Sequence, residues 1–414
     1  MPIALLLFPS LRIALLGIAA IPFIYYGLAL FSSVRFFAVR KPKPLQTRPS
    51  HIFSSEEFLP PVSILKPVRG LDPEAYQNFA SFCRLDYPEY EILFIVGDTA
   101  DPALPVIQRV ASDFPHVNIR TIIGSGREAT NDKCAKLARL TEEAAHEHLV
   151  INDSDVRVEP NYLRRLMPPL ADPNVGAVTC LYAPDQNFTE KSTWVQNLQE
   201  AGMLSDFYPG LFVAKELDGI KFALGPTIAT RVSNLREFGG YAAIENRPAD
   251  DLLIGRLIAE QGREVILLPY IVNTVPDFQS FGELFFKRLR WMTVMRHMRP
   301  AGHLGLIFTL GLPWTILALV LAPNAEIALS FLFAYLFVRS LLTVIVGGQL
   351  RQSGLWKQIL MVPLWDAVAT AIWAASLFRR TIRWRGHDYV IVNGQLVPAR
   401  SQEALAVAAQ HVEP

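Results

Sequence analysis

The distribution of apolar runs constrains the fold of this chain more than any other feature of its sequence. The runs cover residues 11–32, 303–322, 326–346 and 358–378. A helix needs about 20 predominantly apolar residues to cross a bilayer, so each run is long enough to span one. A more polar region, from about Pro60 to Arg299, separates the first run from the other three. The sequence therefore predicts a globular domain flanked by N-terminal and C-terminal transmembrane helices.

Composition and charge support this prediction and exclude other classes of protein. The 414 residues are 51% hydrophobic and only 19% charged, which is too apolar for an ordinary soluble enzyme. The net charge of +1 gives no reason to expect nucleic acid as a partner. The three cysteines, Cys83, Cys134 and Cys180, form no CxxC pair. They indicate neither a disulfide framework nor a zinc site, and they fit a reducing cytosolic setting.

The first apolar run is open to two interpretations, a cleaved signal peptide or a retained membrane anchor. A signal peptide has a shorter apolar core that ends in a small-residue cleavage site. This run is long and no such site follows it cleanly, which favours an anchor within residues 1–40. Basic residues follow the run: Arg35, Arg40, Lys41, Lys43 and Arg48. By the positive-inside rule, the region after the anchor faces the cytosol.

The C-terminal part leaves the number of membrane crossings open. If all three C-terminal runs span, the basic tail RRTIRWRGHDY (379–389) lies outside, against the positive-inside rule. Either one run is re-entrant or interfacial, or the tail is an exception. We expect the chain to consist of four parts: an anchor (1–40), a globular domain (60–300), membrane helices (301–380) and a tail (381–414). A Pro- and Ser-containing linker over 41–60 joins the first two.

The central region alternates segments of two kinds. Strands are expected at 61–67, 90–98, 118–124, 148–155 and 175–182, and helices at 73–84, 103–114 and 131–145. This alternation predicts an α/β, Rossmann-like domain with a mainly parallel sheet that is covered on both faces. Ligands of such sheets bind at the carboxyl ends of the strands.

Acidic residues stand where two of these strands end. Asp98 ends one strand, and the pair Asp153 and Asp155 ends another, so we expect all three in one crevice. Paired carboxylates suit a hard cation, Mg²⁺ or Mn²⁺, that also binds substrate phosphates. The structural alternatives are an Asp-rich surface turn for the pair and a helix N-cap for Asp98.

Two later segments carry further candidates. Asp250 and Asp251 precede an amphipathic helix, where capping is the alternative, but two adjacent acids exceed what one cap needs. One of them is suited to act as a general base on an acceptor hydroxyl. The segment 285–300 is a basic amphipathic helix of the kind that lies on a membrane surface. Within it, Arg290 beside Trp291 is suited to pair with phosphate oxygens.

The order of these motifs resembles a known family. Asp98, then Asp153-Ser-Asp155, then Asp251, then KRLRW (287–291) resembles the D, D, D, (Q/R)xxRW series of processive and lipid-directed family 2-type glycosyltransferases. The segment VSILKPVRGLDPEAYQNFASFCRLDYPEYEILFIVGDTADPA, together with DSDVRV, KFALGPTIATR and WRGHDY, is similar to ceramide glucosyltransferases. Hopanoid-biosynthesis glycosyltransferases share much of this pattern. The resemblance implies a GT-A fold, a nucleotide-sugar donor, an inverting mechanism and a membrane lipid acceptor.

The resemblance also implies a role for each motif residue. Asp98 matches the acid that contacts the nucleotide base or ribose, and Asp153 and Asp155 match the acids at the ribose and the metal–diphosphate. Asp251, with Asp250 as its neighbour, matches the presumed base. Arg290 and Trp291 match the end of the last motif.

Three further positions concern donor and acceptor recognition. Lys287 stands where the family has Gln or Arg, and it keeps the charge without the planar fork. Lys133, in NDKCAKL, resembles a donor-side N-x-K element; the alternative is a capped helix start with a solvated lysine. Asp206 stands where animal ceramide enzymes carry a His.

The expected function is sugar transfer to a membrane lipid. We expect glucose from UDP-glucose to be transferred onto a hydroxyl of ceramide, which gives a β-glycolipid. The alternatives are N-acetylglucosaminyl transfer to a hopanoid lipid, a processive polysaccharide synthase, and a non-catalytic membrane scaffold or lipid-binding protein. The resemblance places the enzyme in the bacterial inner membrane, or in the Golgi membrane of a eukaryote, with its catalytic domain facing the cytosol.

Overall fold

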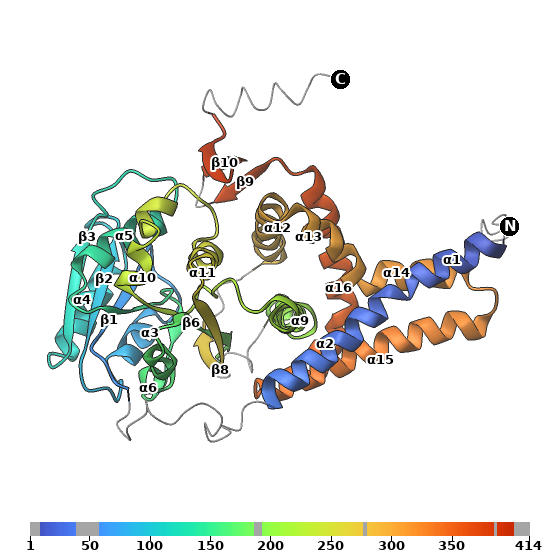
Figure 1. The fold of residues 1–414 in the computed structure, drawn as a ribbon, viewed down its shortest axis with the longest axis horizontal. Coiled ribbons are helices and arrows are strands. Elements are labelled where there is room, and N and C mark those ends of the chain that lie inside the picture. The colour runs from blue at the N-terminus through green and yellow to red at the C-terminus, as the bar shows by residue number, and fades with distance from the viewer. Residues whose placement is uncertain (1–8, 39–57, 186–192, 276–279, 385–386, 401–414) are drawn as a thin grey trace. The chain divides into compact units, whose positions relative to one another are not determined.

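The computed structural model describes residues 9–38, 58–185, 193–275, 280–384 and 387–400 (Figure 1). The expected linker over 41–60 lies outside these residues except for its last three. The chain divides into two compact units. The membrane unit comprises residues 1–41, 189–217 and 278–386, and the sheet unit comprises 42–188, 218–277 and 387–414. The boundaries expected at 60, 300 and 380 stay predictions.

The sheet unit is built on an eight-stranded sheet in the order β3-β2-β1-β4-β7-β6-β8-β5. The strands are β1 (Val62–Pro67), β2 (Tyr90–Val96), β3 (Asn118–Ile123), β4 (His148–Ile151), β5 (Val156–Arg157), β6 (Val175–Pro184), β7 (Ile228–Arg231) and β8 (Glu264–Thr274). β1, β2, β3 and β4 pair in parallel, as do β6 and β8. The expected mainly parallel sheet is confirmed, but β7 runs antiparallel between β4 and β6.

Helices of the sheet unit connect these strands. They are α3 (Ala75–Phe82), α4 (Leu104–Asp113), α5 (Asp132–Glu143), α6 (Tyr162–Leu166), α10 (Val232–Arg236) and α11 (Asp250–Glu260), with short 3₁₀ turns η2 (Pro168–Ala171) and η4 (Tyr241–Ile244). The core between sheet and helices is apolar and includes Phe79, Phe82, Phe94 and Val150, all at most 1% exposed. Burial of such side chains is the main stabilising contribution to the domain.

The predicted elements of this region agree with the structure to within two residues at each end, except at one strand end. The strand expected over 90–98 ends at Val96, so Asp98 follows it rather than ending it. β4 ends at Ile151, so the strand expected over 148–155 is wrong for its last four residues. After the strand, Asn152 N still donates to Leu65 O of β1, and its buried side-chain nitrogen lies within hydrogen-bonding distance of Tyr162 Oη, Pro226 O and Thr227 Oγ1. The acids Asp153 and Asp155 therefore lie in a turn after the strand rather than within it.

The membrane unit is helical. Its elements are α1 (Pro9–Ala19), α2 (Ile21–Ala38), α8 (Trp194–Gly202), the π-helical turn η3 (Met203–Phe207), α9 (Tyr208–Asp218), α12 (Phe281–Met298), α13 (Pro300–Gly305), η5 (Leu306–Thr309), α14 (Gly311–Leu321), α15 (Ala325–Gln349) and α16 (Leu355–Phe378). Pro9–Ala38, α15 and α16 are long and apolar enough to cross a membrane. The pair Pro300–Thr309 and Gly311–Leu321, bent by 51°, would add a fourth crossing as one broken span.

The bend before α14 is held by the N-terminal anchor. The Tyr26 hydroxyl donates to Thr309 O at 3.0 Å and accepts from Gly311 N at 2.7 Å. A Cβ at Gly311 would lie 2.4 Å from that hydroxyl, so only glycine fits this contact. α1 packs on α14 and α2 packs on α15, whereas α16 packs on α8 and α12. In Figure 1, α2 and α15 run alongside each other and α16 runs across them.

The expected tail folds in part. β9 (Thr381–Trp384), β10 (His387–Val392) and β11 (Gln395–Pro398) form a sheet in the order β11-β10-β9. Asn393 and Gly394 connect β10 to β11, both with positive φ, as a two-residue hairpin turn requires. From His387 onward the tail belongs to the sheet unit, where Leu396 N donates to Asn246 O at 2.7 Å.

Candidate active site

The turn after β4 presents the two acids of the DSD motif at the carboxyl end of the sheet. Asp153, Ser154 and Asp155 are each half-buried. The Ser154 hydroxyl donates to Asp72, which ties the turn to the loop after β1. Asp155 leads into β5, and its carbonyl accepts from Val275 N at 3.1 Å. The turn is thus held at both ends while its carboxylates stay accessible.

A buried lysine supports this turn from inside the sheet unit. Lys66, in β1, is 0% exposed, and its Nζ donates to Asp153 O at 3.0 Å and lies 3.8 Å from the centre of the Phe82 ring. Burial lowers the pKa of Lys66 to about 7, although Asp155, Asp153 and Asp72 each oppose that shift. An ammonium group is buried at this cost only where it is paired, and here it faces the acidic turn.

Lys133 joins two of the motif acids. Its Nζ lies 2.7 Å from Asp153 Oδ1 and 3.0 Å from Asp250 Oδ2. Burial alone would lower the pKa of Lys133, but Asp153 and Asp250 raise it well above its usual value. Asn131 caps α5 by accepting from Cys134 N, as the capping alternative expected. The lysine of the same motif is nevertheless not solvated, since its side chain is only 14% exposed.

The second pair of acids begins α11. Ala249, immediately before Asp250, has φ 57° and ψ 64°, a left-handed conformation that is costly for a residue with a Cβ. Its side chain provides no cap, and such strained positions cluster at functional sites. The strain turns the chain so that Asp250 faces Lys133 while Asp251 faces the segment before β7.

Asp251 is held in place by backbone donors. Its Oδ2 accepts from Gly225 N at 3.2 Å, its Oδ1 accepts from Leu252 N at 2.8 Å, and its carbonyl accepts from Ala223 N at 3.2 Å. Burial and then the neighbouring Asp250 raise the pKa of Asp251 to about 6, whereas Lys133 opposes the shift. A carboxylate with this pKa is mostly ionised at neutral pH and still basic enough to accept a proton.

Two glycines allow this arrangement. A Cβ at Gly225 would lie 3.2 Å from Asp153 Oδ2 and 3.2 Å from Asp251 Oδ2, so the two oxygens are at most twice that distance apart. A Cβ at Gly255, one turn after Asp251, would lie 2.3 Å from Phe222 C and 2.4 Å from Ala223 N. The absence of a side chain at Gly255 therefore lets α11 touch the backbone that carries Gly225.

We predict that Gly255→Ala destabilises the sheet unit and weakens activity together. The added methyl group must push aside backbone atoms, which costs about 1–3 kcal/mol. It also displaces the Ala223 N–H from Asp251 O. Thermal unfolding and sugar transfer measure the two effects. Gly348→Ala, in α15, is the matched control because nothing lies within 4 Å of its added methyl group. An unchanged midpoint for Gly255→Ala would contradict this account of the contact.

The other sequence-predicted residues lie in two places. Asp98 follows β2 in the sheet unit, is exposed, and accepts from Ala100 N at 2.7 Å; it does not cap α4, whose N-cap is Ala103. Lys287, Arg290 and Trp291 belong to α12 in the membrane unit. There Arg290 Cζ lies 5.7 Å from the centre of the Trp384 ring, and Lys287 Nζ lies 5.9 Å from that of Trp291. Their part in a common site with the acids stays a prediction.

The residues present fit a divalent cation that is bound together with a diphosphate. In the described parts of the chain, no three His, Cys, Asp or Glu side chains gather as a ready metal site. Mg²⁺ commonly takes only one or two protein carboxylates and completes its shell with waters and substrate phosphates. Asp155 and Asp153 offer such oxygens on one accessible turn. Lys133 already neutralises one oxygen of Asp153.

Sequence reasoning missed four residues that build this site: Lys66, Asn152, Gly225 and Gly255. Lys66 left a signal, because it is a charged residue within the apolar strand segment SILKP. Gly225 precedes Pro226, which marks a turn but not its position beside Asp251. Asn152 and Gly255 left no signal, since their importance depends on which backbone atoms they meet.

Comparison with known proteins agrees with this geometry. The model of glycosyl transferase family 21 matches residues 15–397. Ceramide glucosyltransferase 3 of Caenorhabditis elegans is 21% identical over 363 residues, 84% of this chain and 77% of that protein. A ceramide glucosyltransferase of Gibberella zeae is 30% identical over 149 residues, 33% of this chain and 28% of that protein.

A solved structure supports the fold. The mannosyltransferase PcManGT of Pyrobaculum calidifontis, solved with GDP-Man and Mn²⁺, aligns with a TM-score of 0.51 and 17% identity. The alignment covers 88% of this chain and 99% of that one. The expected GT-A fold is thereby confirmed.

Proposed function

Because the chain belongs to glycosyltransferase family 21, we propose that it transfers glucose from UDP-glucose to the primary hydroxyl of a membrane lipid, ceramide. The expectation of an enzyme is confirmed by the family and by the ceramide glucosyltransferase relatives, against a non-catalytic scaffold. The donor, the acceptor and the stereochemistry are our proposal.

One observation supports the proposal most directly: the residues around Gly225 combine a buried base with an acid–lysine network. Asp251 has a pKa of about 6 and is oriented by three backbone contacts. Beside it, Lys133 bridges Asp153 and Asp250. A base needs a neighbouring site for the departing group, and the DSD turn is suited to a metal-bound diphosphate.

The proposed reaction is a single displacement at the anomeric carbon of the sugar. Asp251 takes the proton from the lipid hydroxyl, and the hydroxyl oxygen forms a bond to that carbon. The bond from the carbon to the diphosphate oxygen breaks on the opposite side, and the electron pair leaves with UDP. Inversion of an α-linked donor gives a β-glycolipid. Asp98 holds the base or ribose, and Arg290 of α12 pairs with the leaving diphosphate, with Trp291 and Lys287 beside it.

A divalent cation, when bound, neutralises the charge that develops on the departing diphosphate. Asp155 and Asp153 would hold it. Lys133 orients Asp153 through the contact between its Nζ and Asp153 Oδ1, and it opposes the rise in the pKa of Asp251. Lys66 holds the turn that carries both ligands.

The purified full chain in lipid nanodiscs tests the proposal. UDP-glucose, Mn²⁺ and a short-chain ceramide should give one glucosylceramide, identified by mass spectrometry, with a β-linkage by NMR. Transfer from UDP-N-acetylglucosamine to a hopanoid instead would establish the first alternative. A ladder of polymer products would establish a processive synthase. The absence of any glycosylated product would reject the enzyme assignment made here.

We further propose that the chain crosses the membrane twice between Val275 and β10, the segment that joins two parts of the sheet unit. The sheet unit contains both Val275 and the strands β10 and β11, and Leu396 is hydrogen-bonded to Asn246. Since the two ends of the intervening segment lie on one side of the membrane, the number of crossings between them is even. With three apolar segments available, one of them does not cross.

The segment that stays on the catalytic side is proposed to be α16. It is the least apolar candidate, with a mean hydropathy of 1.5 against 2.1 for α15 and for Pro9–Ala38, and the most buried. It also packs on α8 and α12, neither of which is a candidate span. The bent α13–α14 pair and α15 then cross outward and back. The basic tail stays on the cytosolic side, which agrees with the positive-inside rule.

Single introduced cysteines test this topology in a variant whose native cysteines, Cys83, Cys134 and Cys180, have been replaced. Pro323 lies between α14 and α15, and Ser353 between α15 and α16, and both are exposed. In sealed vesicles with the catalytic domain outward, a membrane-impermeant maleimide should label Ser353→Cys at once and Pro323→Cys only after detergent. The reverse pattern would mean that α15 and α16 cross instead. Equal labelling of both would reject the paired crossing.

A further inference from the structure

A helical insertion links the membrane unit to the catalytic residues along the chain. We define the insertion helices as α8, η3 and α9, residues 194–218, which lie between β6 and β7 in sequence. The described residues 193–217 belong to the membrane unit. Only residues 219–224 separate the end of α9 at Asp218 from Gly225, whose N–H donates to Asp251. The insertion helices and the segment that carries Gly225 are therefore neighbours along the chain.

The middle of the insertion, η3, is tightly packed. It is a π-helical turn, a rare geometry that is frequent at functional sites. A Cβ at Gly202, just before it, would lie 2.2 Å from the Trp365 ring of α16. A Cβ at Gly347 of α15 would lie 3.3 Å from Leu204 and closer still to Leu355. Both α15 and α16 thus contact this turn without room for a methyl group.

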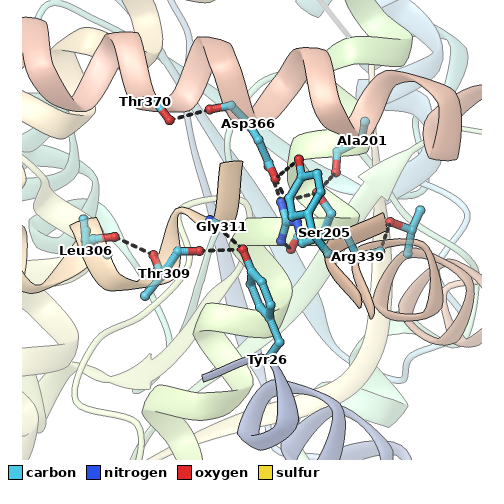
Figure 2. A network of polar contacts seen from close by, with 11 residues as sticks. Tyr26, Ala201, Ser205, Leu306, Thr309, Gly311, Arg339, Asp366 and Thr370 are labelled. Atoms are coloured by element: carbon cyan, nitrogen blue, oxygen red, sulfur yellow. Dashed lines mark hydrogen bonds and ion pairs between the residues drawn. The ribbon is translucent and has the colours of Figure 1, made fainter. Parts of the chain in front are cut away.

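A buried ion pair between α15 and α16 also reaches η3 (Figure 2). Arg339 and Asp366 are 3% and 2% exposed, and Arg339 Nε donates to Asp366 Oδ2 at 3.0 Å. The Tyr335 hydroxyl donates to the same carboxylate at 2.8 Å. The other end of the guanidinium donates to Ser205 O and to Ser205 Oγ, the latter at 3.1 Å. Arg339 therefore connects α15 and α16 to the centre of the insertion.

Joining α15 to α16 does not by itself require charges. Replacing a buried ion pair by apolar residues of similar size is often neutral or stabilising, because desolvation offsets the attraction. What an apolar pair cannot do is donate two hydrogen bonds to Ser205. That contact is the specific effect of the charged pair, and ionisable residues inside membrane helices mark functional positions by default.

We propose that Arg339 and Asp366 are positioning residues for the lipid acceptor: by holding Ser205 they fix η3, whose half-buried carboxylate, Asp206, meets the polar head of the acceptor. Asp206 is the one charged residue of η3. It follows Ser205 directly, so its orientation depends on the backbone that Arg339 holds. The inference rests on the proposed lipid transfer and adds to it the residues that control acceptor binding.

The test separates acceptor binding from donor binding in the full chain in nanodiscs. In the double variant Arg339→Met/Asp366→Leu, neither member of the ion pair is left without the other. The KM for short-chain ceramide should rise about tenfold or more, because two hydrogen bonds from a charged donor to Ser205 are lost. The KM for UDP-glucose, and the slow hydrolysis of UDP-glucose without acceptor, should not change. Ser205→Ala should raise the acceptor KM about threefold.

Two control variants each remove a buried side-chain hydrogen bond that does not involve η3. Tyr335→Phe removes a hydrogen bond to Asp366 and leaves Ser205 in place. Ser376→Ala removes the hydrogen bond of the buried His303, which joins α13 to α16. Both should keep the wild-type acceptor KM.

Three outcomes would overturn the inference: an unchanged acceptor KM in the double variant, an equal rise in both KM values, or a rise in the controls. If the double variant does not fold, as seen by its thermal midpoint, Ser205→Ala decides alone. A wild-type chain that makes no glycolipid rejects the proposed function instead, which distinguishes the two failures.

Discussion

The variant Asp251→Asn should lose sugar transfer by about 10³-fold in kcat, because general-base catalysis contributes about 10²–10⁴. The two donors use different carboxylate oxygens, so the single amide oxygen can keep the hydrogen bond from Leu252 N or the one from Gly225 N but not both. The thermal midpoint, measured beside the rate, separates a local structural change from loss of the base. The KM for UDP-glucose should change little, since the base acts on the acceptor. Steady-state transfer by the purified full chain measures both constants.

The same residue should set the acid limb of the pH profile. Burial and Asp250 raise the pKa of Asp251 to about 6, and only its carboxylate can take a proton. The wild-type rate should therefore fall below about pH 6, approaching tenfold for each further pH unit. The residual rate of Asp251→Asn should lack this limb.

Asp86→Asn is the control for this variant, because Asp86 is an exposed acid paired with Arg164 on the surface. Its rate and its pH profile should match the wild type. A transfer rate for Asp251→Asn within a few fold of the wild type would remove Asp251 from the mechanism, and an identical acid limb would assign the limb to another group.

Lys133→Met should cost about 10² in transfer and shift the acid limb to higher pH. The lysine bridges Asp153 and Asp250, so its loss leaves two half-buried or buried carboxylates without their partner. Lys133 also lowers the pKa of Asp251, and removing a nearby positive charge raises the pKa of an acid. The limb should thus lie above pH 6. Rate measurements from pH 5 to 9 test both effects.

Lys221→Met is the matched control, since that lysine is half-exposed and pairs with Asp218 on the surface. It should leave the limb in place. If Lys133→Met lowers the rate without moving the limb, the lysine acts on the donor alone and does not tune the base.

The sheet unit was largely predictable from sequence because its strands and helices carry strong local signals. β1 and β2 are apolar runs that end in turn residues, and α4 and α5 are amphipathic. β7 was not predictable in the same way. It has only four residues, and its antiparallel place between β4 and β6 depends on long-range pairing, which no local pattern reveals.

The candidate site was predictable only in part, for a similar physical reason. Sequence order identified Asp153, Asp250 and Lys133, and the structure brings these three together. It did not identify Lys66, whose role comes from its position beneath a turn that lies 87 residues further along the chain. It also could not separate Asp250 from Asp251. The strained backbone at Ala249 directs one to the lysine and the other to Gly225.

The hydrogen bond from Leu396 to Asn246 has a consequence for biogenesis. The loop that carries Asn246 also supplies the carbonyls of Glu245 and Arg247 to Asn131, the cap residue of the helix that bears Lys133. The ribosome makes Leu396 only after every hydrophobic helix has been synthesised. A chain that crossed the membrane an odd number of times before β11 would place β11 on the opposite side of the membrane. Leu396 could then not reach Asn246. The hydrogen bond between Leu396 and Asn246 can therefore form only after correct insertion. A C-terminal fusion should begin after residue 400 so that β11 stays intact.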